Sequence, residues 1–221
     1  MADYYIGLMS GTSMDALDAV LVDFSSQPLR LISQLSKPLP DDLREQLLSL
    51  ASTGENELER MAKADILLGR FSAKTVEELL TEAGIAREQV QAIGSHGQTI
   101  RHAPNTTPPY TVQIGDGNTI AQDTGIMTVN DFRRRDMAVG GQGAPLVPAF
   151  HAALYRHREI DRVVLNIGGM ANISILPAEM KLPVSGFDTG PGNVLLDAWS
   201  QHIKGELYDA DGQWGRSGKV N

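Results

Sequence analysis

The stretch Gly7–Phe24, GLMSGTSMDALDAVLVDF, is the most informative part of this 221-residue chain for its fold. An apolar run enters a turn of glycine and hydroxylated residues, and the chain then leaves the turn as alternating apolar and acidic residues. The run predicts a buried strand at 4–9 and the alternation predicts a second strand at 17–24. The turn between the two strands is either an ordinary polar hairpin loop or a cradle for phosphate.

The phosphate alternative rests on the chemistry of the turn at Gly11. Successive backbone N–H groups, a glycine that permits close approach, and the hydroxyls of Thr12 and Ser13 suit phosphate oxygens. Asp15 and Asp18 follow, and Mg²⁺ prefers such oxygen ligands. The turn has neither the GxxxxGK[ST] pattern of a P-loop nor the GxGxxG pattern of a dinucleotide site.

Composition excludes several classes of protein. A net charge of −8 and a pI of about 5.1 argue against nucleic acid as a partner. The chain has no cysteine, which excludes disulfides and thiolate chemistry and fits a reducing cytoplasm. We expect no signal peptide and no membrane span, because the N-terminus lacks a basic region and no apolar run approaches about 20 residues.

The pattern of the whole chain alternates strands and helices. Helices are predicted within 41–83, with Asp41 and Asp42 as caps at the start and Gly84 as the C-cap, and again at 119–123. Further strands are predicted at 32–39, 90–95, 111–115 and 126–130, with SHGQTIRH as a loop after the second of these. RVVLNIGGMANISIL, from Arg162, repeats the strand, glycine turn and strand of the N-terminus. The repeat predicts two related lobes, at 1–150 and 151–221.

The second glycine turn and the segment GFDTGPGN carry the next candidates. Gly168, Gly169 and the amide of Asn172 form either a second phosphate cradle or a tight hairpin. Asp188 is predicted at a strand end, before a glycine loop and a helix that opens at Asn193. A carboxylate in that place suits a general base, and helix capping by Asp188 or Asn193 is the alternative.

Two polar clusters follow predicted strands. His96, Gln98 and Thr99 are expected to bond sugar hydroxyls, with loop solvation as the alternative and a metal site with His102 disfavoured because no acidic third ligand is suitably spaced. Arg133 and its neighbours in DFRRRD suit a carboxylate or phosphate, unless they pair with Asp131 and Asp136.

Six segments together resemble one family, the 1,6-anhydro-N-acetylmuramic acid kinases. In chain order they are GLMSGTSMDALDAVLV, GSHGQTIRH, QIGDGNTIAQDTGI, VNDFRRRDMAVGGQGAPLVPAFH, LNIGGMANI and GFDTGPGN. They extend over essentially the whole chain, and six motifs in order are far more specific than any one alone.

The resemblance implies a two-lobed actin-like, ribonuclease-H-like ATPase fold and a cytoplasmic kinase of cell-wall recycling. It implies that ATP and Mg²⁺ bind the glycine hairpins, that the sugar lies against the polar clusters, and that the enzyme is a homodimer. Asp188 is implied as the catalytic base and Asp15 and Asp18 as metal ligands. The implied nucleotide-binding residues are Gly11, Thr12, Ser13, Met14, Asp15, Asp18, Asn166, Gly168, Gly169 and Asn172. The implied sugar-binding residues are His96, Gln98, Thr99, Asp131, Arg133, Gly190 and Asn193.

The chain departs from the family pattern in two ways. Ala16 stands where the family usually has glycine. The family is also more than half as long again, so we expect the second lobe to be incomplete and its uncovered apolar surface to favour self-association. Two other functions therefore stay open: an inactive fragment that only binds sugar or phosphate, and a kinase of another amino sugar.

Overall fold

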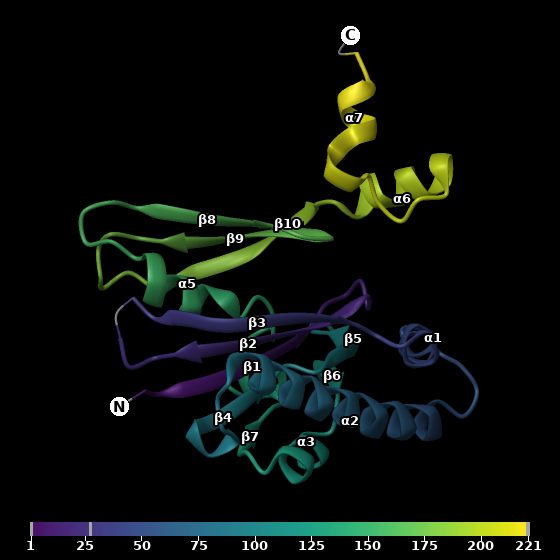
Figure 1. Cartoon of the computed structure of the whole chain (residues 1–221). Helices are drawn as coiled ribbons and strands as arrows, with labels where there is room; N and C mark the ends of the chain where they lie inside the picture. The colour runs from purple at the N-terminus through teal and green to yellow at the C-terminus, as the bar shows by residue number, and fades with distance from the viewer. Residues whose placement is uncertain (1, 27, 220–221) are drawn as a thin grey trace. The chain divides into compact units, whose positions relative to one another are not determined.

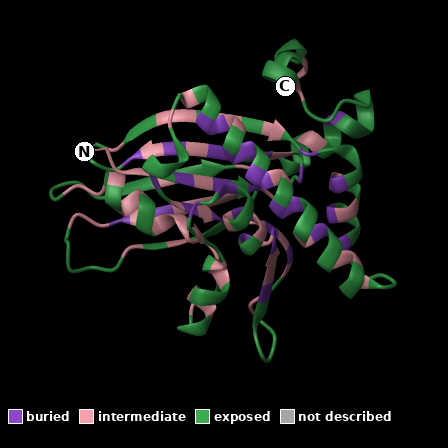
Figure 2. Ribbon diagram, turned by 60° about the horizontal axis from the view of Figure 1, so that its bottom comes forward, coloured by how far each residue is buried: buried purple, intermediate pink, exposed green. Residues whose placement is uncertain are grey.

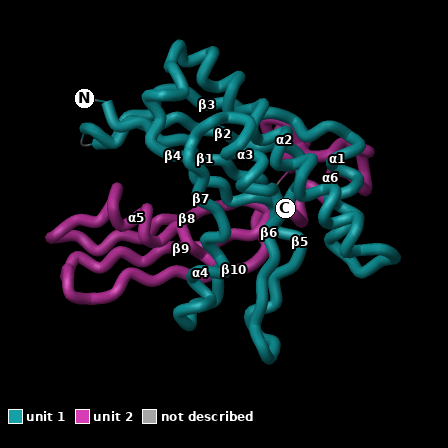
Figure 3. The backbone as a smooth tube through the Cα atoms, turned by 90° about the horizontal axis from the view of Figure 1, so that it is seen from below, with its two compact units in different colours: residues 1–143 teal, residues 144–221 magenta. Residues whose placement is uncertain are grey.

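The computed structural model describes residues 2–26 and 28–219, and the chain divides into two compact units, Met1–Gly143 and Ala144–Asn221. Figure 3 shows the two units in different colours. Both combine strands with helices, so the chain is an α/β protein. Each unit is described separately below.

Unit 1 is built on a mixed sheet with the order β3-β2-β1-β4-β7. β1, β2 and β3 form an antiparallel meander, whereas β4 pairs in parallel with β1 and β7 pairs in parallel with β4. This arrangement is that of a ribonuclease-H-like unit, which confirms the predicted fold class. The strands are Tyr4–Ser10, Ala16–Asp23, Arg30–Pro38, Val90–Ser95 and Thr128–Val129 for β1, β2, β3, β4 and β7.

Helices complete the core of unit 1. α2 (Glu57–Ala83) packs on β2 and β3 and also on α1 (Asp41–Leu50) and α3 (Gly117–Thr124) (Figure 1). Apolar side chains of these helices meet those of the sheet, and the most deeply buried include Leu21, Leu47, Leu68, Leu79 and Ile93. Figure 2 colours the chain by burial, with buried residues in purple. Within the described ranges, every helix is too short or too polar to cross a membrane.

The segment SHGQTIRH is not the loop that the sequence predicted. Gln98–Ala103 forms strand β5, which pairs antiparallel with β6 (Tyr110–Ile114) in a separate two-stranded sheet. The pairing satisfies backbone groups that a loop would leave to water, and it buries Gln98 and Ile100. The predicted strand at 126–130 is likewise shorter, because only Thr128–Val129 pairs with β4.

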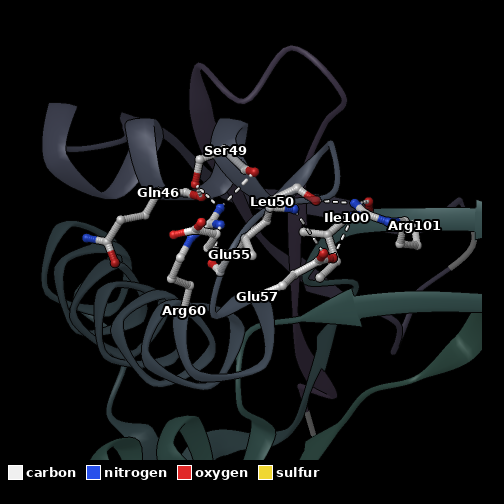
Figure 4. A network of polar contacts seen from close by, with 9 residues as sticks. Gln46, Ser49, Leu50, Glu55, Glu57, Arg60, Ile100 and Arg101 are labelled. Carbon is white, nitrogen blue, oxygen red and sulfur yellow. Dashed lines mark hydrogen bonds and ion pairs between the residues drawn. The ribbon is translucent and has the colours of Figure 1, made fainter.

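Two arginines bond the end of α1, and one of them, Arg101, ties the β5–β6 hairpin to the helices (Figure 4). Arg101 Nη2 donates to Glu57 Oε1 at 2.5 Å, and its Nη1 donates to the carbonyl of Leu50 at the end of α1. Arg60 Nη2 donates to the carbonyl of Ser49 at 2.8 Å. The last carbonyls of α1, which have no partner inside the helix, are therefore satisfied by guanidinium groups. The contacts of Arg101 also fix β5 against α1 and α2, whereas the contact of Arg60 joins α2 to α1.

The predicted capping of α1 is wrong in detail, and that of α2 is right at its end. Pro40 is the N-cap of α1, and neither Asp41 nor Asp42 makes a cap hydrogen bond, although both lie in the first turn where a negative charge is favourable. α2 ends at Gly84, whose φ of 65° is the left-handed conformation of a glycine C-cap.

Unit 2 contains a three-stranded antiparallel sheet in the order β10-β9-β8. The strands are Arg162–Ile167 for β8, Met170–Leu176 for β9 and Ser185–Pro191 for β10. The helices are α5 (Val147–Tyr155), which packs on β9, α6 (Val194–Lys204) and α7 (Gln213–Ser217). Large apolar side chains of β8 and α6 are exposed, among them Val163, Leu165, Ile167, Leu196 and Trp199.

Asp23, at the end of β2, makes the stability of unit 1 sensitive to acid. Its carboxylate accepts from the backbone N–H groups of Asp3 at 3.0 Å and Ser25 at 2.9 Å, and Arg30 lies 3.2 Å away. These contacts, the Asp3 N–H first, lower the pKa of Asp23 from 3.8 to about 2. The folded state thus holds the charged form more strongly than the unfolded state does.

We predict that Asp23→Asn removes part of the acid sensitivity of folding. A lowered folded-state pKa adds stability above pH 3.8, and that stability is lost as the pH falls towards about 2. Urea unfolding at pH 7, 4 and 2.5 should give a shallower loss for Asp23→Asn than for wild type. Asp123→Asn, at an exposed position, is the control and should follow wild type. Equal slopes for all three proteins would contradict the prediction.

Candidate functional site

The turn between β1 and β2 is tightly organised by its own residues. The N–H of Met14 donates to the carbonyl of Gly11 at 3.2 Å, and Met14 is buried with a φ of 51°. Arg44 from α1 donates to the carbonyl of Met14 at 3.0 Å. A Cβ added to Gly11 would meet only the Ser13 hydroxyl, at 3.9 Å. The fold of the described residues therefore does not itself require glycine there, which leaves a ligand as a reason for it.

Asp15 closes this turn as a charged group. Its Oδ1 accepts from the Ser13 hydroxyl at 2.6 Å and from the N–H of Ala16 at 2.9 Å. The Ser13 hydrogen bond is the main cause that lowers the pKa of Asp15, and it outweighs the opposing effect of burial. Asp18 lies in β2, opposite Met9, and is also exposed.

Asp15 and Asp18 fit the needs of Mg²⁺ in donor chemistry. The ion takes carboxylate oxygens and keeps several waters, so Asp15 at the turn and Asp18 in β2 are groups of the type that it binds. Among residues 2–26 and 28–219, no group of three or more histidine, aspartate or glutamate side chains is arranged to hold a metal ion.

The turn between β8 and β9 is joined to the start of α6. The carbonyl of Gly168 accepts from the N–H of Asn193 at 2.9 Å, and the carbonyl of Gly169 accepts from the N–H of Gly192 at 2.9 Å. A Cβ on Gly192 would overlap the carbonyl of Gly168, whereas a Cβ on Gly168 would meet only the Met170 carbonyl, at 3.7 Å. Glycine at 192 is therefore required by packing, and glycine at 168 is not.

A row of polar residues crosses the sheet of unit 2 beside this turn. Asn166 on β8 pairs with Asn172 on β9, and Asn172 pairs with Asp188 on β10. Directly opposed residues of antiparallel strands have their side chains on the same face, so the three form one cluster. The Oδ1 atom of Asn172 is buried and has no hydrogen-bond partner among the residues that the structure describes. A buried acceptor of this kind is one that a donor of a bound water or ligand would satisfy.

The sequence predicted Asp188 at the end of a strand, but the structure places it inside one. β10 continues to Pro191, and the pairing with β9 shifts between Asp188 and Gly190, where Gly190 has a φ of 136°. Such a bulge redirects side chains and is frequent beside active sites. Asn193 occupies the N-cap position of α6, as the alternative had it, but its side chain makes no cap hydrogen bond, and Asp188 lies within β10.

Two of the residues predicted to bond sugar hydroxyls, Gln98 and Thr99, differ in how deeply they are buried. Gln98 is fully buried and accepts from the Ser10 hydroxyl at 2.7 Å, which joins β5 to β1. Thr99 is half-buried, and its hydroxyl accepts from Gln113 at 3.0 Å. Ser10 was not singled out in the sequence, where nothing distinguishes it from other strand-end serines.

The fold brings His96 and Arg133 together. His96 directly follows β4, and Arg133 lies on α4 (Phe132–Ala138). Arg133 Nε donates to His96 Nε2 at 2.8 Å, and Arg133 Nη1 donates to the carbonyl of Gly143 at 2.7 Å. Burial chiefly lowers the pKa of His96, and the Arg133 charge lowers it further. Asp131 pairs with Arg134 at 2.6 Å, which is the self-pairing that the sequence left open.

Comparison with known proteins gives one consistent result. The family model "Anhydro-N-acetylmuramic acid kinase" matches residues 3–221. A curated protein of that name from Shewanella loihica is 53% identical over 218 residues, which cover 99% of this chain and 59% of the relative. One from Coxiella burnetii is 53% identical over 216 residues, which cover 98% of this chain and 58% of the relative. The chain thus spans a little under three fifths of the length of these relatives.

Two of the solved structures that resemble the chain do so distantly. The type IV pilus PilM–PilN complex aligns with a TM-score of 0.46 at 17% identity and covers 96% of this chain and 69% of its own. The Schistosoma mansoni hexokinase complexed with glucose aligns with a TM-score of 0.38 at 13% identity, covering 90% and 42%. Likenesses of this degree carry no information about function. The match over residues 3–221 and the identity of 53% show instead that the chain belongs to the anhydro-N-acetylmuramic acid kinase family.

Proposed function

We propose that the chain is part of, or constitutes, a kinase that opens 1,6-anhydro-N-acetylmuramic acid with water and phosphorylates its O6. The observation that carries the proposal is the family match, which includes both glycine hairpins and the segment with Asp188. The product is N-acetylmuramic acid 6-phosphate, an intermediate of peptidoglycan recycling.

The reaction has to combine hydrolysis with phosphoryl transfer. The O6 of the substrate is locked in a bridge to the anomeric carbon, so it offers no free hydroxyl. A water oxygen bonds to the anomeric carbon while the bond from that carbon to O6 breaks. O6 then bonds to the γ-phosphorus of ATP as the bond from that phosphorus to the leaving oxygen of ADP breaks. One proton of the water must be accepted by a base.

Asp188 is our candidate for that base. It is exposed, and it stands at the end of the polar row with Asn166 and Asn172, beside the bulge in β10. A carboxylate that activates water against an anomeric carbon follows the chemistry of an inverting glycosidase. The buried oxygen of Asn172, which none of the described residues bonds, is placed to accept from a bound ligand.

The two glycine turns are our candidates for phosphate binding. Gly11 and Gly168 both leave room where a Cβ would lie, which supports approach by a ligand. We propose the residues of the first turn, with Asn166, Gly168, Gly169 and Asn172 of the second, as the nucleotide contacts. Bound Mg²⁺ would be held by Asp15 and Asp18 and would neutralise charge on the phosphates.

The remaining site residues and the setting of the reaction are also proposals. We propose sugar contacts from Thr99, Asp131, Arg133, Gly190 and Asn193, and a supporting role for His96 and Gln98, whose polar side-chain atoms bond other residues of the chain. We further propose a cytoplasmic homodimer without nucleic-acid or membrane partners, which agrees with the negative net charge and the absence of cysteine.

A coupled assay of ADP release with mass analysis of the sugar product tests the proposal. The chain, a version extended to the length of its relatives, and the Shewanella loihica kinase as positive control are given ATP, Mg²⁺ and the anhydro sugar. We expect a product heavier than the substrate by one water and one phosphoryl group. Turnover of N-acetylglucosamine but not of the anhydro sugar would instead assign a kinase of another amino sugar.

Two glycine variants test the phosphate turns separately. Gly11→Ala and Gly168→Ala should fold normally, because an added Cβ meets no close atom, yet each should weaken ATP binding at least about tenfold if a phosphate approaches the backbone there. Nucleotide affinity is measured by calorimetry and folding by thermal denaturation. Unchanged affinity in both variants would show that these turns do not hold the nucleotide.

A further inference from the structure

The glycine-rich segment at the end of unit 1 is held by the helix before it. After α4 the N–H groups of Val139 and Gly141 donate to the carbonyl of Asp136, at 3.1 and 3.0 Å. The carboxylate of Asp136 then accepts from the N–H of Gly143 at 2.8 Å. Gly143 is the last residue of unit 1 and has a φ of 74°, a conformation that favours glycine.

Arg133 holds the same residue from its other side. Its Nη1 donates to the carbonyl of Gly143 at 2.7 Å, while its Nε donates to His96. Both polar groups of the Gly143 backbone are therefore bonded to side chains of α4. A planar guanidinium can make these two bonds at once because its donors point in fixed directions, which a lysine ammonium does not reproduce.

His96 completes the arrangement and has a defined tautomer. Its Nε2 lies 2.8 Å from the Nε of Arg133, which can only donate, so Nε2 must be the accepting nitrogen. Its Nδ1 lies 2.7 Å from the carbonyl oxygen of Gly97 and must carry the hydrogen. The neutral ring of His96 thus lies between the end of β4 and α4.

Protonation of His96 would oppose this arrangement. A second hydrogen, on Nε2, would face the N–H and the positive charge of Arg133. Burial and the Arg133 charge both lower the pKa of His96, and the Gly97 carbonyl raises it less. Arg133, on α4, is the charged group that acts on His96, while β1 contributes the backbone carbonyl of Leu8, which accepts from the His96 N–H at 3.0 Å.

We propose that His96, Arg133 and Asp136 form a clamp on Gly143, which fixes the backbone where the chain leaves unit 1. His96 is then a positioning residue rather than a direct sugar contact, because the clamp uses both of its ring nitrogens. The clamp does not depend on the proposed kinase activity, since all of its contacts lie within unit 1. It also opens in acid, when His96 takes up a proton.

Nuclear magnetic resonance of the wild-type chain tests the tautomer without any substitution. The ¹⁵N shifts of the His96 ring should report hydrogen on Nδ1 and a bare Nε2 at pH 7.5. Hydrogen on Nε2 would overturn the clamp, because Arg133 Nε could not then donate to that atom.

Hydrogen exchange at the Gly143 amide tests the clamp itself. We expect Arg133→Lys and Asp136→Ala each to speed exchange at Gly143 by about tenfold, the effect of losing roughly one hydrogen bond. Arg134→Lys is the matched control, because the next arginine of α4 pairs with Asp131 instead, and it should leave the rate unchanged. Equal rates in all of these variants and wild type would overturn the proposal.

The pH dependence distinguishes a clamp from general support of the fold. In wild type, protection at Gly143, corrected for the intrinsic effect of pH on exchange, should fall as the pH drops through the lowered pKa of His96. His96→Gln keeps an acceptor for Arg133 but does not titrate, so it should keep the protection without the step. A step that persists in His96→Gln would show that another group is responsible and would overturn the assignment to His96.

Discussion

Asp188→Asn is expected to lower turnover of the anhydro sugar by roughly 10²- to 10⁴-fold, the usual contribution of a general base. The amide has the shape of the carboxylate but does not accept a proton from water. Because Asp188 is exposed and its polar neighbours are asparagines, the change should leave folding intact. Release of ADP, measured with the anhydro sugar at saturating ATP, gives kcat, and calorimetry with ATP alone gives nucleotide affinity. We expect the first to fall and the second to stay unchanged.

The control for this prediction is Asp197→Asn. Asp197 lies on α6, outside the polar row of unit 2, and its replacement removes the same charge. This variant should keep turnover within about threefold of wild type, a change below about 1 kcal/mol in the barrier. If Asp188→Asn retains turnover at the level of this control, Asp188 is not the base. If both variants lose ATP affinity as well, the charge of unit 2 supports nucleotide binding rather than water activation.

Gly97→Ala is expected to destabilise the chain by about 3 kcal/mol or more. Gly97 has a φ of 70°, and an added Cβ would overlap the carbonyl oxygen of Ile114 on β6. The left-handed conformation costs an alanine roughly 1–2 kcal/mol, and forced overpacking adds roughly 1–3 kcal/mol. The overlapping atom belongs to the backbone, so it cannot move aside as a flexible side chain would. Urea unfolding followed by circular dichroism measures the free energy of unfolding.

Gly84→Ala separates the two causes of that effect. Gly84 has a φ of 65°, close to that of Gly97, but an added Cβ there has no atom of the described residues within 4 Å. It should therefore cost only the backbone term, roughly 1–2 kcal/mol. If Gly97→Ala is no more destabilising than Gly84→Ala, the β5–β6 hairpin shifts to accommodate the added atom. The close approach at Gly97 then contributes nothing to the free energy of unfolding.

Local patterns were sufficient for most of the elements. The strands β1, β2, β4 and β6 and the two long helices follow from apolar periodicity, since a period of two or of 3.6 residues sets which face is buried. β5 was missed because Gln98 and Thr99 are polar, and only pairing with β6 and burial against β1 make a strand of them. The start of α1 was misjudged because capping by a side chain depends on atomic geometry that Asp41 and Asp42 do not adopt.

The candidate site also has parts that the sequence reveals and parts that depend on the fold. The glycine turns and Asp188 can be found in the sequence, because glycine clusters and a carboxylate among them are local signals. The row that joins Asp188 to Asn172 and Asn166 depends on strand register. The bond between His96 and Arg133 joins residues 37 positions apart and depends on how α4 meets the end of β4.

The order of the amino acids was enough to establish the family, the α/β class and most of the succession of strands and helices. Backbone preferences and apolar periodicity act over a few residues, and six ordered motifs identify a family. Only the folded structure shows which polar atoms already have hydrogen-bond partners within the chain. Folding places Gln98 in the core against Ser10 and engages both ring nitrogens of His96, whereas it buries an oxygen of Asn172 that no described residue bonds. Those outcomes depend on contacts between distant segments, whose geometry no local pattern encodes.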